Sequence, residues 1–280
     1  MKSFCIKTNN NQIRNYLLNN FSSIDFDDIY YISRKFKIYE NIIIHYTGKD
    51  INEFLGLLST IITDCILIYY EPILIRRSIN FNYFYFDDFE KKNIEEICYN
   101  YILIDEDNTL KFRKDEIWQI VLNYIIENKS MVLDGFVNFR LEDYLNTIDN
   151  IVDYSVNKYV VEKEYHEFIN LLKQYIDSKE NVVDLVHIIY TNGESILLDK
   201  DKNIIQFNDS IFDNKYLSDI TFSSNDFTLN TLLTLLPKKI EIHIIDYEDE
   251  FINTLKLIFD KRIFVCKGCN LCKTYQAISH

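Results

Sequence analysis

Glycine and proline are scarce in this chain, and their scarcity limits the kinds of site it can contain. Only five glycines and two prolines occur among the 280 residues. Five glycines leave little material for a phosphate-binding loop, and the sequence contains no Walker A, G-x-G-x-x-G or G-x-S-x-G pattern. We therefore expect no nucleotide-dependent chemistry, and our interpretation leans away from an enzyme. A Cys-His catalytic pair that meets only in the folded chain stays open as an alternative.

Positive charge is also in short supply. The chain has 30 Lys and Arg against 43 Asp and Glu, which gives a formal net charge of −13 at pH 7. Such an excess of negative charge repels a nucleic-acid backbone and an anionic membrane surface. We therefore expect no nucleic-acid partner. Binding to nucleic acid would require a local basic patch, for which Arg76, Arg77 and the lysines near the C-terminus are the candidates.

The sequence lacks an export signal and a long uninterrupted apolar run. Its N-terminus, MKSFCIKTNNNQ, has no apolar core or small-residue cleavage site. The most apolar stretch, Leu57–Ile75, is interrupted by Thr63, Asp64, Glu71 and Pro72, and it falls short of the roughly 18 consecutive apolar residues expected of a spanning helix. We therefore expect a buried helix, no transmembrane segment and a cytoplasmic protein.

Apolar periodicity, by contrast, is well developed and predicts an α+β fold in three parts. Residues 1–48 read as a small β-α-β-β segment whose hairpin turns around Tyr39-Glu40-Asn41, and Asp50 is placed to cap the helix that follows. Residues 49–180 read as a mainly helical region. The helices expected there run from Asn52 to about Tyr70, and over Pro72–Ile79, Asp87–Ile102 and Lys114–Asn128, followed by a central pair separated at Glu162-Lys163-Glu164.

Residues 181–280 read as an α/β-type domain with a β-hairpin. Asn192-Gly193 between two β-prone runs predicts a two-residue hairpin turn. A helix capped by Asn225 or Asp226, a strand over Lys239–Ile245, a second helix and a strand over Arg262–Cys266 then predict a parallel strand pair.

The central stretch, Asp134 to Ile176, carries the clearest helical period and one unusual feature. Phe136, Phe139 and Arg140 lie three and four residues apart at its entrance, on one predicted helical face. Packing of the arginine stem over the rings, or pairing with Asp143, is one interpretation. The alternative is a surface that binds a partner through Phe139 and Arg140.

The residues of this stretch support a family resemblance. The run GFVNFRLEDY, then VDYSVNKYVVEKEYHEFINLLKQYI and VVDLVHIIYTNGESILLD, resembles the YtxC family of sporulation proteins from endospore-forming bacteria. The resemblance covers roughly Leu55–Leu198 and is strongest over Gly135–Tyr175. It implies a cytoplasmic protein associated with sporulation, and it supplies no catalytic residue.

The cysteines provide the one sharp chemical hypothesis. Cys266, Cys269 and Cys272 are separated by two-residue gaps after a predicted parallel strand, and Gly268 permits a tight turn. In a reducing cytosol this spacing favours a metal or redox site over disulfides. The sequence does not identify a cofactor, and zinc and an iron–sulfur cluster are the candidates. A fourth ligand is required, and His243, His280 or a cysteine of a second subunit are the candidates.

Two functions follow from these observations. The first is a non-enzymatic, sporulation-associated protein that acts through protein contacts made by the helical region. The alternative is a metal-binding or thiol-redox protein that uses the C-terminal cysteines. Against this alternative stands the interpretation that the three cysteines bind nothing. The sequence indicates neither the partner nor the oligomeric state.

Overall fold

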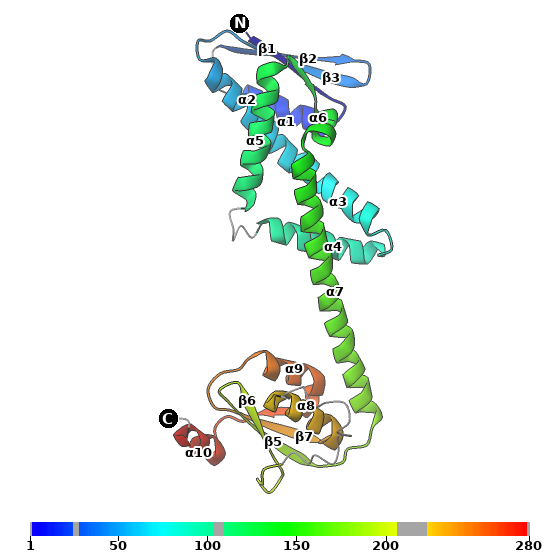
Figure 1. Ribbon diagram of the computed structural model, residues 1–280, viewed down its shortest axis with the longest axis vertical. Coiled ribbons are helices and arrows are strands. Elements are labelled where there is room, and N and C mark those ends of the chain that lie inside the picture. Colours follow the sequence, from blue (N-terminus) through cyan, green and yellow to red (C-terminus); the bar gives the residue numbers. More distant parts are fainter. Residues whose placement is uncertain (1, 25–27, 104–108, 206–222, 279–280) are drawn as a thin grey trace. The chain divides into compact units, whose positions relative to one another are not determined.

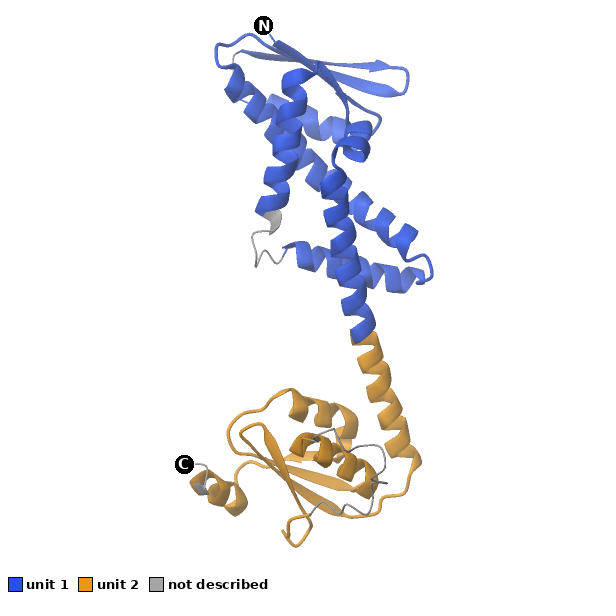
Figure 2. Ribbon diagram, viewed as in Figure 1, with its two compact units in different colours: residues 1–161 blue, residues 162–280 orange. Residues whose placement is uncertain are grey.

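The structure is a computed structural model that describes residues 2–24, 28–103, 109–205 and 223–278. The chain forms two compact units, residues 1–161 and 162–280 (Figure 2). Each unit has its own four-stranded sheet and its own hydrophobic core. The α+β class is confirmed. The three-part division at residues 48 and 180 stays a prediction.

Unit 1 begins with the predicted β-α-β-β segment and places one further strand beside it (Figure 1). The strand order is β2-β3-β1-β4, with β4 parallel to β1. Period-2 alternation buries one face of β1 and β3 against the helices. The strands are β1 (Lys2–Thr8), β2 (Ile29–Phe36), β3 (Tyr39–Tyr46) and β4 (Ser130–Val132).

The turn between β2 and β3 lies earlier than predicted. Lys37 and Ile38 form it, and Lys37 adopts the left-handed conformation with φ of 55°. Tyr39, Glu40 and Asn41, the predicted turn residues, instead pair with β2 in the ladder. A two-residue connection of this kind matches the right-handed twist of the two strands, which explains why the ladder continues through the polar residues.

The helices of unit 1 pack on the covered face of the sheet and on one another. Asp50 caps the second helix as predicted, since its Oδ1 accepts the N–H groups of Asn52 and Glu53 at 3.0 and 3.1 Å. The helices are α1 (Asn11–Ser22), α2 (Ile51–Cys65), the π-helical turn η1 (Ile66–Tyr70), α3 (Glu71–Asn82), α4 (Asp88–Leu103), α5 (Thr109–Glu127), α6 (Leu133–Arg140) and the first part of α7 (Glu142–Ser178).

Two predicted helix breaks are absent. Ile51–Asn82 is a continuous helical run, in which the π turn η1 accommodates Pro72, whose nitrogen cannot donate a hydrogen bond. Glu162-Lys163-Glu164 lies inside α7, because Glu and Lys are good helix formers. The backbone leaves the helical conformation at Leu141 instead, between α6 and α7.

Ile51–Asn82 also meets the criteria of length and composition for a membrane span. Its most apolar 18-residue window has a mean hydropathy of 1.7, and 50% of that window is buried inside the structure. A core helix of a globular protein meets the same criteria. The burial agrees with the expectation of a helix that packs in the core of unit 1.

Unit 2 contains a sheet of order β6-β5-β7-β8 in which β5, β7 and β8 are parallel. The hairpin at Asn192-Gly193 is confirmed, with φ of 54° and 77° at these residues. Ser223, rather than Asn225 or Asp226, caps α8, and Asp226 completes the capping box. The elements are β5 (Leu185–Thr191), β6 (Glu194–Leu198), α8 (Ser224–Leu235), β7 (Lys239–Ile244), α9 (Glu250–Phe259), η2 (Asp260–Arg262), β8 (Ile263–Val265) and α10 (Asn270–Ile278).

Candidate metal centre

The carboxyl ends of β7 and β8 bring a histidine and three cysteines together. His243 lies near the end of β7, and Cys266 follows β8 directly. The Cys266 N–H donates to the Ile242 carbonyl at 2.8 Å, which extends the parallel pairing to the first cysteine. The chain then turns through Gly268, whose φ of 113° favours glycine. Cys269 precedes α10, and Cys272 lies in its first turn.

The four side chains form a compact set of possible ligands. Their ligand atoms all lie within 4.8 Å of one another. Cys272 Sγ lies 3.8 Å from Cys266 Sγ and 3.9 Å from Cys269 Sγ. His243 Nδ1 lies 3.4 Å from Cys272 Sγ and 3.5 Å from Cys269 Sγ.

These separations match the edges of a zinc tetrahedron. Zn–S bonds of about 2.3 Å and Zn–N bonds of about 2.0–2.1 Å at tetrahedral angles place sulfurs about 3.8 Å apart and nitrogen about 3.6 Å from sulfur. Both values lie close to the observed ones. An iron–sulfur cluster spreads its cysteines over two or more irons, which holds some of the sulfurs much farther apart. The geometry therefore favours a single ion over a cluster.

Burial and local hydrogen bonds set the protonation of these groups. Burial lowers the pKa of His243, so the ring is neutral at pH 7, as a metal ligand must be. Burial raises the pKa of Cys266 to about 11. Burial acts in the same direction on Cys269, but hydrogen bonds from the backbone N–H groups of Cys272 and Leu271 and from the Cys266 thiol outweigh it and hold the pKa of Cys269 below its usual value. Of Cys266 and Cys269, Cys269 is thus the one closer to the thiolate form.

A second histidine supports the first. His243 Nε2 lies 3.1 Å from His187 Nδ1, and both rings are buried. A metal bound to His243 Nδ1 would leave the ring proton on Nε2, which could then be donated to His187 and would fix the orientation of the ring. Glu241 Oε2 lies 3.7 Å from His187 Nδ1. His187 and Glu241 therefore form the outer shell of the candidate site.

The structure brings together only part of what the sequence suggested. His243 is the candidate fourth ligand that reaches the cysteines, whereas His280 lies outside the described residues. His187 was not anticipated at the site, and only its place on the strand beside β7 could have indicated it. The three isolated cysteines occur in apolar runs, which predicts buried side chains; Cys65 and Cys98 are buried, whereas Cys5 is only half-buried. Burial raises the pKa of Cys65 to about 12.

The residues suggested for partner binding lie in unit 1, at the end of α6. Phe136 is buried in the core, whereas Phe139 is 82% exposed and Arg140 is exposed. Among the described residues, Arg140 forms no ion pair with Asp143 and no cation–π contact. Pairing with Asp143 therefore finds no support, and partner binding through Phe139 and Arg140 stays a prediction.

Comparisons with known proteins place the chain in a family. The YtxC-like family matches residues 56–264. The Bacillus subtilis (strain 168) protein named "Uncharacterized protein YtxC" is 22% identical over 187 residues, which cover 65% of this chain and 66% of that protein, just under two thirds of its length. No solved structure matches. The family match includes His243 but ends before the three cysteines, and it spans well over half of the sequence. The chain belongs to the YtxC-like family.

Proposed function

We propose that the C-terminal unit binds one structural Zn²⁺ ion through His243, Cys266, Cys269 and Cys272. The observation that carries this proposal is the agreement between four of the six donor-atom separations and the edges of a zinc tetrahedron, with the other two within 4.8 Å. Three thiolates and one neutral imidazole complete the coordination sphere. No position is left for water or substrate, so the ion acts in folding rather than in catalysis.

The ion would fasten α10 to the sheet of unit 2. Cys272 is the buried side chain among the described residues of α10, and Tyr275 and the others are half-buried or exposed. A nine-residue helix with so little apolar burial is marginal by itself. Cys269 and Cys272 would bind the same ion as His243 on β7. These bonds would attach α10 to the sheet, because apolar packing alone holds the helix only weakly.

Elemental analysis tests this proposal directly. We expect one zinc per chain in colourless protein purified without air and without a metal-binding tag. Cys269→Ser and His243→Ala should each lose the zinc, whereas Cys5→Ser, which removes a thiol of unit 1, should retain it. Absence of metal, or zinc retained in both site variants, would refute the assignment. A coloured protein that contains iron would redirect it to another cofactor.

The cellular role we propose is a non-enzymatic one in sporulation, in the cytoplasm, through protein contacts made by unit 1. Support comes from membership of the YtxC-like family and from the exposure of Phe139 and Arg140. A pull-down from sporulating cells should recover a specific partner that Phe139→Ala and Arg140→Ala each lose. Phe112→Ala, which removes another exposed ring of unit 1, is the matched control. Equal recovery by all variants in folded form would exclude this surface.

A further inference from the structure

A pocket lies in unit 1 among α4, α5 and the first part of α7. Its volume is about 340 Å³, which is within the usual range for small-molecule sites. Its walls are mostly apolar, and the rings of Tyr101 on α4 and Tyr154 on α7 lie with their centroids 4.8 Å apart. Two charged side chains of α5, Arg113 and Glu116, also line it. The pocket therefore combines an aromatic lining with charges of both signs.

Arg113 brings two unused hydrogen-bond donors to this pocket. The residue is 3% exposed, and its Nη1 donates to Glu71 Oε2 at 3.0 Å. Nε and Nη2 are buried and have no hydrogen-bond partner among the described residues. Their N–H groups lie side by side on one edge of the planar guanidinium, and such a parallel pair binds both oxygens of a carboxylate. Because an unsatisfied buried donor is costly, a ligand that supplies these oxygens would be bound favourably.

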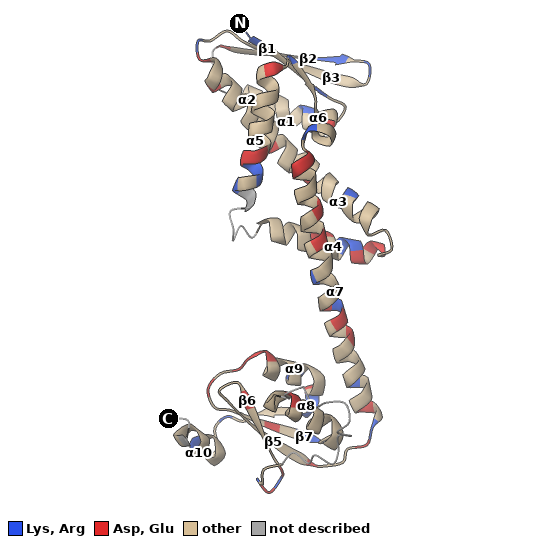
Figure 3. Ribbon diagram, in the orientation of Figure 1, with Lys and Arg blue, Asp and Glu red and all other residues tan. Residues whose placement is uncertain are grey.

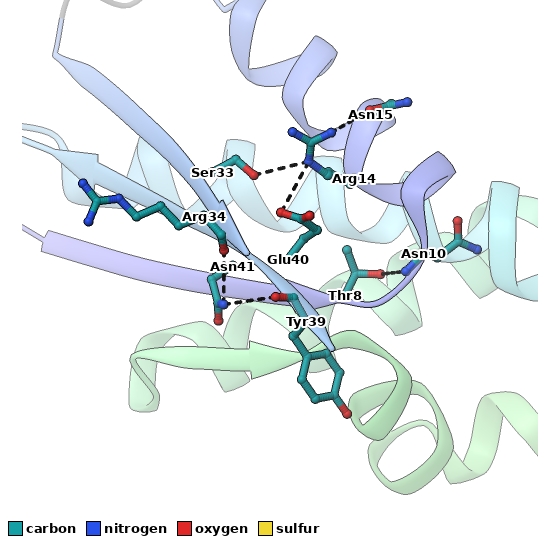
Figure 4. A network of polar contacts seen from close by, with 9 residues as sticks. All are labelled: Thr8, Asn10, Arg14, Asn15, Ser33, Arg34, Tyr39, Glu40 and Asn41. Atoms are coloured by element: carbon teal, nitrogen blue, oxygen red, sulfur yellow. Dashed lines mark hydrogen bonds and ion pairs between the residues drawn. The ribbon is translucent and has the colours of Figure 1, made fainter. Parts of the chain in front are cut away.

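Arg14 on α1 provides a comparison within the same unit (Figure 4). Its Nε lies 3.4 Å from Ser33 Oγ and 3.6 Å from Glu40 Oε2, and its Nη1 donates to Asn15 Oδ1 at 3.4 Å. The Arg14 side chain is 35% exposed, so water is available to its remaining donors. Neither the described protein atoms nor bulk water satisfy Nε and Nη2 of Arg113, and these unpaired donors are therefore a local feature of the pocket.

The charges around the pocket favour a ligand that carries both signs. Figure 3 shows acidic and basic residues together near the start of α5. Arg113 and Glu116 are three residues apart and share a helical face, yet they form no ion pair with each other among the described residues. Burial raises the pKa of Glu116, and the Asp143 carboxylate adds to the shift. Because Glu71 already neutralises Arg113, the carboxylates of Glu71 and Glu116 would repel a purely anionic ligand, whereas a purely cationic one would leave the Arg113 donors unpaired.

We propose that this pocket binds a free α-amino acid with an aromatic side chain. The carboxylate of the ligand accepts hydrogen bonds from Nε and Nη2 of Arg113, and its ammonium pairs with Glu116. The aromatic side chain packs against Tyr101, Phe112 and Tyr154, where ring contacts add to the burial of apolar surface. The ligand has no net charge, so it satisfies the donors without adding to the negative charge of the pocket. Because both nitrogens lie beneath the pocket surface, the carboxylate displaces part of the wall to reach them.

Titration calorimetry on the full chain with its metal compares phenylalanine with two fragments of it. Phenylpropionate lacks the ammonium, and phenethylamine lacks the carboxylate. We expect saturable binding of phenylalanine with a dissociation constant of about 1 mM or below, as a ligand of this size allows, and at least roughly tenfold weaker binding of each fragment. Absence of saturable phenylalanine binding up to about ten times that concentration would overturn the inference. Equally tight binding of either fragment, or of inorganic phosphate, which lacks both the ammonium and the ring, would overturn it as well.

Substitution of Arg113 tests the carboxylate contact. Arg113→Lys keeps a cation beside Glu71 but loses the parallel donors, and it should weaken phenylalanine binding by roughly tenfold or more. Arg14→Lys is the matched control, because Arg14 lies outside the pocket, and it should leave the affinity unchanged. Equal affinity of wild type and folded Arg113→Lys for phenylalanine would refute this contact.

Substitution of Glu116 tests the ammonium contact and decides the case if Arg113→Lys fails to fold. Glu116 is half-buried and has no hydrogen-bond or ion-pair partner among the described residues, so Glu116→Gln should leave the fold intact. The variant should bind phenylalanine roughly tenfold more weakly but phenylpropionate no more weakly, because phenylpropionate has no ammonium to pair. An equal loss for both ligands, or no loss for either, would contradict the proposal. The pocket lies in unit 1 and the candidate zinc site in unit 2, so either proposal can fail without the other.

Discussion

A buried ion pair in unit 1 should respond very differently to removal of one charge and to removal of both. Arg113 on α5 is 3% exposed, and its Nη1 donates to Glu71 Oε2 at 3.0 Å. The Tyr144 hydroxyl donates to the same oxygen at 2.6 Å. Arg113 Nε and Nη2 are buried and have no partner among the described residues. The guanidinium therefore compensates Glu71 while two of its own donor groups stay unsatisfied.

These contacts fix the expected magnitudes. Arg113→Met leaves the Glu71 carboxylate buried with only Tyr144, and loss of one partner of a buried pair costs about 3–5 kcal/mol of unfolding free energy. The double variant Glu71→Gln/Arg113→Met removes both charges and keeps an acceptor for Tyr144. It also removes the orphaned donors, each of which costs about 1–3 kcal/mol. We expect the double variant to lie within about 1 kcal/mol of wild type, or above it.

Trp118 provides an assay that reports on unit 1 alone. It is the single tryptophan of the chain, lies on α5 with Arg113 and donates to Thr60 Oγ1 at 3.2 Å. Its fluorescence in urea therefore reports the unfolding of unit 1. The two-state approximation is then applied to one unit and not to the whole two-unit chain. Lys114→Met is the control, because the Lys114–Asp64 pair is partly exposed and should contribute less than about 1 kcal/mol. The reasoning is refuted if Arg113→Met is no worse than this control, or if the double variant is as unstable as Arg113→Met.

Three further predictions concern the metal site and acid stability. His187→Ala should lower zinc affinity roughly 10- to 100-fold without abolishing binding, measured by competition with a chelating dye, and the exposed His166→Ala should change nothing. Chelation should speed hydrogen exchange across α10 and leave β5 protected; equal protection with and without metal would contradict the attachment role. Burial raises the pKa of Glu95, but hydrogen bonds from Arg76 and Tyr99 outweigh it and hold that pKa below the ordinary 4.5. The stability that Glu95 contributes is therefore present above pH 4.5 and lost as pH falls through the lower folded value, so wild type and Glu95→Gln should converge in urea titrations on acidification.

The local part of the candidate site could be predicted from the sequence, and the distant part could not. Cys-x-x-Cys-x-x-Cys spacing predicts three neighbouring thiols whatever the rest of the chain does. His243 lies 23 residues before Cys266, and only the parallel pairing of β7 with β8 brings it there. The strand, helix and strand prediction contained that pairing, so His243 could be named as a candidate. His187, on β5, required the order of the whole sheet.

The fold shows the same division between local and distant information. The hairpin at Asn192-Gly193 and the cap at Asp50 follow from a few adjacent residues, and both are confirmed. The three-residue strand β4 has too little sequence to show a period, and its pairing with β1 depends on residues 125 positions apart in the chain, Cys5 and Ser130. Glu71 and Arg113 are likewise 42 residues apart, so their ion pair carries no pattern in the sequence.

The family match and the candidate metal site divide the functional question into parts that can be tested separately. The match ends at residue 264, so it gives the three cysteines no role shared with the relatives. It includes Phe139 and Arg140, together with the whole of α7. If Cys269→Ser loses zinc and the attachment of α10 but still captures the partner proposed for unit 1, the ion stabilises unit 2 and unit 1 carries the contact. If partner capture is lost as well, the zinc-dependent fold of unit 2 is part of the binding surface, and the proposal that unit 1 acts alone is wrong.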